Sequence, residues 1–275
     1  MKSALIVGFT LCVVLACSGS SSAAQEETWK DLNAQASAFL QQGKIDKAVT
    51  AVDDSVRSAE GQFSADNAKM IPVLNAAAEL YKGMEKLANA ESAYARILAI
   101  NEKTSGAESA EVAVTLDNIG RLYCFENKLL DAEGVFKRSL AIKEKVYGPK
   151  SVNTAMALDN LAEVYRSQAR HADAEDVYLR ALAVTESELG KDHPTVASEK
   201  TGLADTYMAE GKYSEAEPLY RQVLERNEKA RGASGGAIAS SRIDLAECLK
   251  KMGDTQEAKD LMAQANASSP QPLKK

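Results

Sequence analysis

The sequence has little of what most catalytic and metal-binding sites require. Its 275 residues include two His, four Cys, six Pro and one Trp, and aromatic residues make up 5%. So few His and Cys leave little material for a metal site, and the low aromatic content is unlike a β-sandwich or barrel. Ala, Leu, Glu and Lys are abundant instead, as in helices. The composition therefore predicts an almost entirely helical, soluble chain with no cofactor.

The charge balance bears on the class of partner. Thirty-three basic residues stand against thirty-nine acidic ones, which gives a net charge of −6. A surface that binds nucleic acid needs an excess of Lys and Arg to neutralise phosphates. We therefore expect no nucleic-acid partner.

The N-terminus has the features of an export signal. An apolar run covers residues 4–16, which is shorter than the roughly 20 residues that span a bilayer. Two processing routes are open: cleavage after Ala24, or lipidation of Cys17 in Val14-Leu15-Ala16-Cys17, which resembles the bacterial lipobox. Residues 1–24 are thus predicted to be a signal peptide or lipoprotein leader with a Ser-rich tether, and the protein to be periplasmic or anchored to the bacterial outer membrane.

A strict forty-two-residue period runs through the rest of the chain. The pattern consists of an Ala column, two largely aromatic columns and a Leu column, with glycines at the joints. The Ala column is Ala48, Ala90, Ala132, Ala174, Ala216 and Ala258, and the aromatic columns include Tyr123, Tyr165 and Tyr207, and Phe136, Tyr178 and Tyr220. A fixed period of this size is typical of stacked helical hairpins that cover one another's apolar faces.

The order of residues inside one unit indicates the kind of hairpin. A small residue is followed three positions later by an aromatic residue on the same helical face, so that a partner helix can approach closely. Gly43, Asn127, Gly211 and Gly253 then stand where a left-handed residue ends the first helix. A cation follows this break, and the second helix continues with Ala, an aromatic residue and Leu at intervals of four.

This order resembles the tetratricopeptide repeat. The period is longer than the usual one of about 34 residues and is similar to that of kinesin light chains. The sequence resembles the kinesin light chain repeat most closely at residues 190–194, 212–220 and 158–162. The resemblance implies an all-α solenoid of six repeats over residues 25–266, at about 29–66, 67–109, 110–151, 152–194, 195–236 and 237–266, with a disordered tail at 267–275. The heptad coiled coil of kinesin light chains is absent, which indicates an exported bacterial relative without a motor-cargo role.

Candidate catalytic residues are few. Gly232-Ala233-Ser234-Gly235-Gly236 fits the G-x-S-x-G pattern of serine hydrolases, but Gly232 falls on a joint of the period and no strand precedes it. His193, just before Pro194, is expected to cap a helix. Glu91, Glu133, Glu175 and Glu217 form a column beside the Ala column, which we expect to be a solvated face. We therefore predict that the protein is not an enzyme.

The resemblance also implies where a ligand binds. First helices of such solenoids line a concave groove that holds an extended peptide, and Asn118 and Asn160 match asparagines that grip a peptide backbone in kinesin light chains. Groove charges are expected to pair within the helix, Asp117 with Arg121 and Glu163 with Arg166, or to meet basic residues of the partner. The predicted groove comprises Asn75, Glu79, Lys82, Asp117, Asn118, Arg121, Asp159, Asn160, Glu163, Arg166 and Asp205.

We therefore expect a scaffold that binds another protein through an extended segment outside the cytoplasm. The alternative is a lipoprotein that helps to assemble an outer-membrane secretion or pilus complex, using its outer edges as well as its groove.

Overall fold

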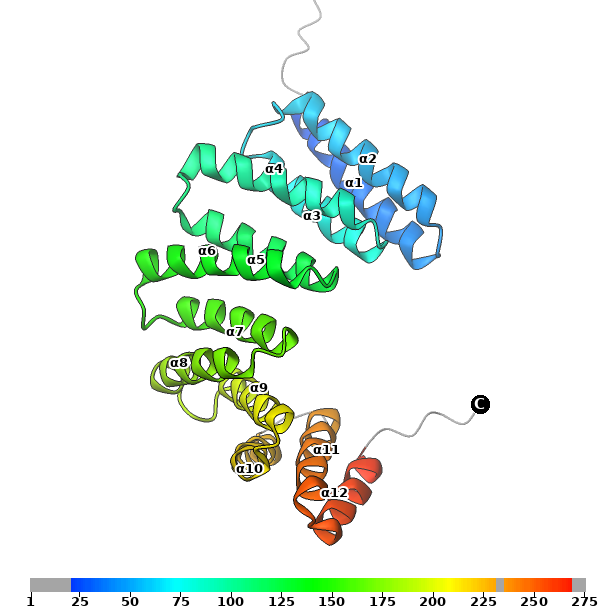
Figure 1. Ribbon diagram of the computed structural model, residues 1–275. Helices are drawn as coiled ribbons and strands as arrows, with labels where there is room; N and C mark the ends of the chain where they lie inside the picture. Colours follow the sequence, from blue (N-terminus) through cyan, green and yellow to red (C-terminus); the bar gives the residue numbers. More distant parts are fainter. Residues whose placement is uncertain (1–20, 231–234, 269–275) are drawn as a thin grey trace, which may run out of the picture. The chain divides into compact units, whose positions relative to one another are not determined.

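The computed structural model describes residues 21–230 and 235–268, and the side chains from Thr28 onward. These residues form twelve α-helices and no strand, which confirms the all-α prediction (Figure 1). Cys17, Gly232, Ser234 and residues 269–275 lie outside the described residues, as do most of the predicted leader and its lipobox-like sequence, whereas the predicted cleavage point after Ala24 falls within the first helix. The chain divides into two compact units, Met1–Ala93 and Tyr94–Lys275, with the boundary inside α4.

The first unit holds three helices and the beginning of a fourth. Its elements are α1 (Ser21–Gln41), α2 (Ile45–Gln62), α3 (Met70–Gly83) and the first part of α4 (Leu87–Ser105). α1 packs along α2 as a hairpin, and the Ser55 hydroxyl donates to the Trp29 carbonyl at 3.0 Å. α1 begins at Ser21, inside the segment expected to be a tether.

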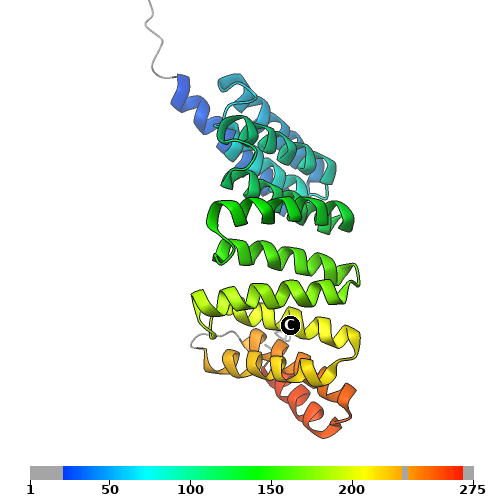
Figure 2. The same cartoon turned by 60° about the vertical axis from the view of Figure 1, so that its left-hand side comes forward.

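The second unit continues the pattern in helical pairs. Its helices are α5 (Ala110–Phe125), α6 (Leu129–Tyr147), α7 (Val152–Ser167), α8 (His171–Leu189), α9 (Pro194–Glu210), α10 (Tyr213–Lys229), α11 (Gly235–Met252) and α12 (Thr255–Ser268). Each helix packs against the next, and α7 also contacts α5 and α9. Figure 2 shows the pairs from α5 to α10 stacked one on another. The first helices α5, α7 and α9 therefore form one continuous layer in this unit.

The Ala and aromatic columns of the period form the core between first and second helices. Ala132, Ala174 and Ala216 are fully buried, and Phe136 and Tyr178 are nearly so. A Cβ built on Gly120 would lie 2.5 Å from the Phe136 ring, so the small residue is what allows the ring to pack there. Tetratricopeptide-like spacing in the sequence thus corresponds to real helix packing.

Helix ends follow the predicted pattern and extend it. Gly43, Asn127, Gly211 and Gly253 all have positive φ, as expected, and so do Glu85 and Ala169 at the equivalent positions. His193 caps α9, where its Nδ1 accepts from the Thr195 N–H at 3.2 Å. α12 continues to Ser268, so the first residues of the expected tail are helical.

Candidate functional site

First helices in the second unit expose one narrow stripe. On α5, Val114 and Phe125 are 54% and 60% exposed, Arg121 is exposed and Asn118 half-buried, whereas the intervening residues 115–117, 119–120 and 122 are buried. Offsets of four, three and four place such residues on one side of a helix. We call this stripe, with its equivalents at steps of one period, the first-helix face. Its members are Val114, Asn118, Arg121 and Phe125; Met156, Asn160, Glu163 and Ser167; Ser198, Gly202, Asp205 and Ala209; Ser240, Asp244, Glu247 and Lys251.

Asn118 and Asn160 occupy the same place on adjacent helices of this face. Both side chains are half-buried. The Asn118 Oδ1 accepts from the Arg121 guanidinium at 2.6 Å, whereas the Asn160 amide makes no hydrogen bond to any described residue. An amide both donates and accepts, so Asn160 has the capacity to bind the backbone of an extended segment.

Asp117 is not on the face, contrary to expectation. It is 6% exposed, and its carboxylate accepts from the Ser139 hydroxyl at 2.6 Å and from the Lys143 ammonium at 2.5 Å. The predicted pair with Arg121 is therefore wrong. One residue is about 100° of helix rotation, which turns Asp117 toward α6 while Asn118 faces outward.

Asp159 stands at the equivalent place one repeat later, but without a cation. Position 185, which corresponds to Lys143, carries Thr185, whose hydroxyl donates to Glu199 instead. Asp159 Oδ1 and Glu199 Oε1 are both buried, and no N–H or O–H group of another described residue donates to either atom. Burial first, and then the adjacent Glu199 and Glu163, raise the pKa of Asp159 to about 8, which indicates that the two carboxyl groups share a proton.

Tyrosine hydroxyls of the second helices donate hydrogen bonds to two carboxylates of the first-helix face. The Tyr178 hydroxyl donates to Glu163 at 2.8 Å, and the Tyr220 hydroxyl donates to Asp205 at 2.6 Å. Arg166 pairs with Glu163 at 2.7 Å, as predicted for this i, i+3 pair. Burial raises the pKa of Asp205, a shift that the bond from Tyr220 opposes.

The predicted groove residues of the first unit lie on α3. Glu79 is exposed, whereas Asn75 and Lys82 are half-buried. Lys82 pairs with Glu79 at 2.7 Å. By the period, Glu79 is the equivalent of Arg121, and Lys82 is the equivalent of Arg166 in the second unit.

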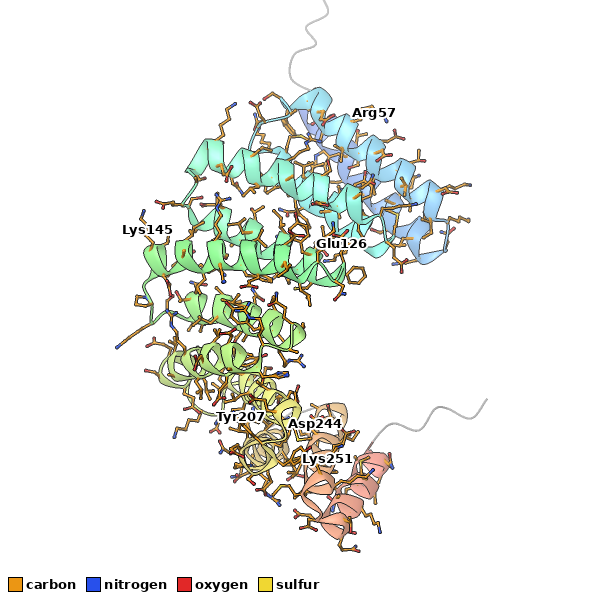
Figure 3. All side chains as sticks on the ribbon, viewed as in Figure 1. Arg57, Glu126, Lys145, Tyr207, Asp244 and Lys251 are labelled. Carbon is orange, nitrogen blue, oxygen red and sulfur yellow. The ribbon has the colours of Figure 1, made fainter. Side chains whose placement is uncertain are left out.

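Sequence reasoning missed several members of the first-helix face. Val114 and Met156 are 54% and 52% exposed, and each stands one helical turn before an asparagine. Asp244 and Glu247 continue the face on α11; Figure 3 labels Asp244 and Lys251. The period alone could have found them, because each lies a whole number of periods from another residue of the face.

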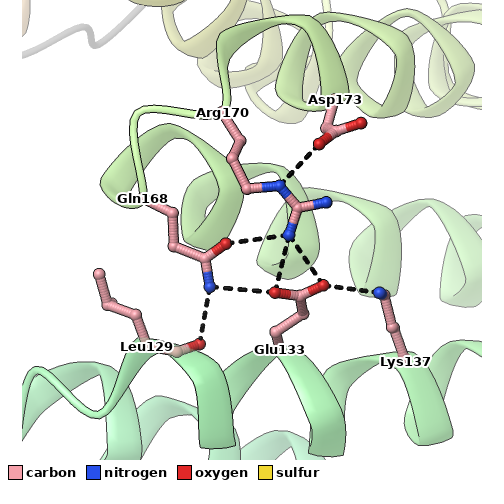
Figure 4. A network of polar contacts seen from close by, with 6 residues as sticks. All are labelled: Leu129, Glu133, Lys137, Gln168, Arg170 and Asp173. Atoms are coloured by element: carbon pink, nitrogen blue, oxygen red, sulfur yellow. Dashed lines mark hydrogen bonds and ion pairs between the residues drawn. The ribbon is translucent and has the colours of Figure 1, made fainter.

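The glutamate column, expected to be solvated, instead connects repeats. Glu133 on α6 is 9% exposed and accepts from Lys137 at 2.6 Å, from Gln168 at 3.0 Å and from Arg170 at 2.9 Å (Figure 4). Burial raises the pKa of Glu133, but these hydrogen bonds outweigh it and bring the pKa to about 2. The expectation of a solvated row is therefore wrong for this residue.

The next member of the column makes the same connection. Glu175 on α8 accepts from the Tyr207 hydroxyl at 2.9 Å and from Lys212 at 3.1 Å. Lys212 is the equivalent of Arg170, and each of these cations also lies over the ring of the aromatic column, at 5.4 Å for Lys212 and 4.2 Å for Arg170. Arg170 and Lys212, the cations after these two helix breaks, thus each join their own repeat to the preceding one.

The described residues contain few groups of the kind that bind metals. No group of three or more His, Cys, Asp or Glu there could hold a metal ion, and Cys124 and Cys248 are free thiols. None of the described helices combines the length and apolarity that crossing a membrane would take.

Known proteins share this architecture. A family model described as "Tetratricopeptide repeat" matches residues 69–145, 111–187, 153–198 and 194–267, and its first three matches begin one period apart. No curated protein matches the chain.

Solved structures with the same fold include a bacterial and a fungal kinesin light chain-like protein. BtubC (BKLC) from P. vanneervenii has a TM-score of 0.70 at 17% identity, over 90% of this chain and 96% of that one. A putative kinesin light chain from Podosopora anserina has a TM-score of 0.64 at 22% identity, over 72% and 94%. PilW, described as a type IV pilus biogenesis factor, has a TM-score of 0.60 at 20% identity, over 89% and 95%. Since the family matches extend over most of the sequence, the chain belongs to the tetratricopeptide repeat family.

Proposed function

We propose that this protein is a non-catalytic scaffold whose first-helix face binds an extended segment of a partner protein outside the cytoplasm. Repeats of this family form scaffolds for protein–protein interaction. The observation that carries the proposal is the placement of Asn118 and Asn160 on adjacent helices of one exposed stripe. Side-chain amides at this spacing suit a peptide backbone, which offers N–H and C=O groups in alternation.

Replacement of both asparagines by Ala tests the binding mode. We expect the double variant Asn118→Ala/Asn160→Ala to retain its helical content but to lose most of the partner captured from an envelope extract, because the backbone of the bound segment loses its amide partners. Asn89→Ala/Asn266→Ala, at two exposed positions on α4 and α12, is the matched control. Full capture by the first variant would refute the proposal.

Export and anchoring belong to the same proposal. The apolar run at residues 4–16 and the lipobox-like sequence ending at Cys17 support a lipid anchor, with cleavage after Ala24 as the other route. Cys17→Ser separates the two, because a lipidated protein loses its membrane partitioning on this change. Unchanged partitioning in fractionated cells would exclude the anchor.

A second candidate is an assembly factor for an outer-membrane secretion or pilus complex. It is supported by the similarity in fold to PilW. Such a factor would use outer surfaces, and Leu130 and Leu179 on the second helices are 79% and 44% exposed. If Leu130→Glu/Leu179→Glu abolishes assembly while the asparagine double variant permits it, this second candidate is favoured.

A further inference from the structure

The first-helix face changes chemistry from one end to the other. Following its columns along the stack, position 114 and its equivalents read Val, Met, Ser and Ser from α5 to α11, while position 121 and its equivalents read Arg, Glu, Asp and Glu. We call Val114 and Met156 the apolar end. We call Glu163, Asp205, Asp244 and Glu247 the acidic end.

At the apolar end two large apolar side chains are exposed to solvent. Val114 and Met156 are more than half exposed, although Leu116 and Leu158, two residues further along each helix, are 1% exposed. Adjacent repeats place the two exposed side chains at the same level of neighbouring helices. Neighbouring apolar side chains in this position are typical of a surface that a partner covers.

At the acidic end Glu163 is paired with Arg166, whereas the charges of Asp244 and Glu247 on α11 are not neutralised from within. Among the described residues, neither Asp244 nor Glu247 forms an ion pair, and Lys251 at the far end of α11 is the cation that the face itself supplies here. The pKa of Asp244 is raised to about 6, first by burial and then by the nearby charges of Asp205 and Glu247. Crowding of like charges disfavours the fold, so this arrangement is not explained by packing alone.

A buried pair of acids on α7 and α9 adds one negative charge near the face, because Asp159 and Glu199 share a proton. Glu199 is 2% exposed, and no N–H or O–H group outside this pair donates to its Oε1 in the described part of the chain. It lies against Asp159, which precedes Glu163 by one helical turn. Lys143 supplies the neutralising cation in the preceding repeat, whereas Thr185 at the equivalent position supplies none.

From these observations, and resting on the proposed function, we infer that the bound segment is extended, with a large apolar residue at one end and Lys or Arg residues at the other. The apolar residue covers the apolar end, the segment's backbone lies across Asn118 and Asn160, and its basic side chains meet the acidic end. The partner is thus recognised by a patterned, basic segment, and an acidic segment is excluded by repulsion.

Selection from a random peptide library tests the pattern even while the partner is unidentified. Peptides of about 12 residues span roughly 40 Å when extended, which is enough to cross the roughly 30 Å between the first and the last of four helices spaced about 10 Å apart. Phage-displayed peptides of this length, selected on the full chain, should be enriched in Lys and Arg on one side of an apolar residue. On Asp244→Asn/Glu247→Gln the basic enrichment should disappear while the apolar preference remains.

A selected peptide then gives a quantitative check by fluorescence anisotropy. The double variant should weaken its binding about fivefold to tenfold, as expected for two partly exposed ion pairs, and Val114→Ser/Met156→Ser should weaken it independently of salt. The matched control Asp176→Asn/Glu188→Gln, at exposed positions of α8, should leave it unchanged.

The outcomes separate the two levels of the proposal. Enriched peptides that lack basic residues, or that are acidic, overturn this inference and leave the proposed function standing. A failure to enrich any peptide contradicts the proposed function itself.

Discussion

At the scale of single residues, the column of Asp117 and Asp159 shows how one replacement changes the role of its neighbour. Both aspartates stand at the same repeat position on first helices. Asp117 meets Lys143, with both side chains less than one-tenth exposed. Asp159 lies beside Glu199 instead, which accepts from the Thr185 hydroxyl, and no cation pairs with Asp159 among the described residues. The same carboxylate is therefore neutralised in one repeat and crowded by a second acid in the next.

We predict that the same substitution at these two positions has opposite effects on stability. Asp117→Asn leaves the buried Lys143 charge unpaired, which should lower the free energy of unfolding by about 3 kcal/mol. Asp159→Asn removes one of two adjacent acids and supplies an amide N–H to Glu199, which should raise stability by about 1 kcal/mol at pH 8. Urea denaturation followed by circular dichroism measures both. Destabilisation by both variants would show that the Asp159 carboxyl is not crowded.

The pH dependence of stability gives an independent check on Asp159. Its pKa is about 8 in the folded protein and about 4 in an unfolded chain. Between these values the folded state holds a proton that the unfolded state has released, so the free energy of unfolding falls as pH rises from about 5 to 8. Glu163 on the same helix and Glu199 on α9 are the charged groups beside Asp159, and Glu186 on α8 lies near Glu199. Asp159→Asn should flatten the decline, and a slope equal to that of the unmutated protein would contradict the assignment.

At the scale of helices, Glu133 is predicted to contribute much of the contact between α6 and the following pair. Glu133→Gln removes the charge that holds Arg170 and Lys137, and should cost about 2 kcal/mol. The control is Glu217→Gln in the same column. Glu217 pairs with Arg221 of its own helix, and that arginine also pairs with Glu257, so the expected cost is about 0.5 kcal/mol or less.

The pH dependence of the Glu133 contribution has the opposite sign to that of Asp159. The pKa of Glu133 is lowered to about 2 in the folded protein. Its contribution is therefore present above the unfolded pKa of about 4.3 and is lost as pH falls toward 2. If Glu133→Gln and Glu217→Gln lower the free energy of unfolding equally at pH 7, the contact of Glu133 with Arg170 of the next repeat does not contribute to stability.

Helix ends provide a prediction that depends on backbone conformation alone. Ala169 ends α7 with φ of 57°, at the place where Gly211 ends α9 with φ of 77°. A left-handed conformation costs a residue with a Cβ about 1 kcal/mol. Ala169→Gly should therefore raise the free energy of unfolding by about 1 kcal/mol and Gly211→Ala should lower it by about 1 kcal/mol, and the thermal midpoint should shift in the same directions. A lower midpoint for Ala169→Gly in differential scanning calorimetry would contradict this account.

The elements themselves could be predicted from the sequence, whereas the direction of each side chain could not. The period identified which residues are equivalent, and Ala174 and Tyr178 pack as it indicated. It did not fix the rotation of each helix, so Asp117 was placed on the face in error. Nor could it explain why Gly202 interrupts the asparagine column. A Cβ there would lie 2.5 Å from the Tyr178 ring, whose hydroxyl passes this point to reach Glu163.

At the scale of the whole molecule, a strict period implies that repeats are interchangeable units. In such arrays stability is approximately a sum of repeat and neighbour terms. In the second unit, the groups that join one repeat to the next recur at the same positions: Glu133 meets Arg170, and Glu175 meets Lys212. Helix starts are interchangeable as well, because Ser151 caps α7 and His193 caps α9 at equivalent places.

We therefore predict that removal of residues 152–193, one whole period, leaves a folded protein. Ser151 would then precede Pro194 and cap α9 with a serine, a favoured arrangement at a helix start, and Lys212 would meet Glu133 in place of Arg170. We expect unchanged ellipticity per residue, a single cooperative urea transition and a smaller m-value, because less surface is exposed on unfolding. The control removes residues 159–198, two residues short of the period, so that α7 continues into α9 about 200° out of register and the side chains after the junction face away from their partners. If the two deletions are equally folded or equally unfolded, the period describes the sequence but does not govern how the repeats pack.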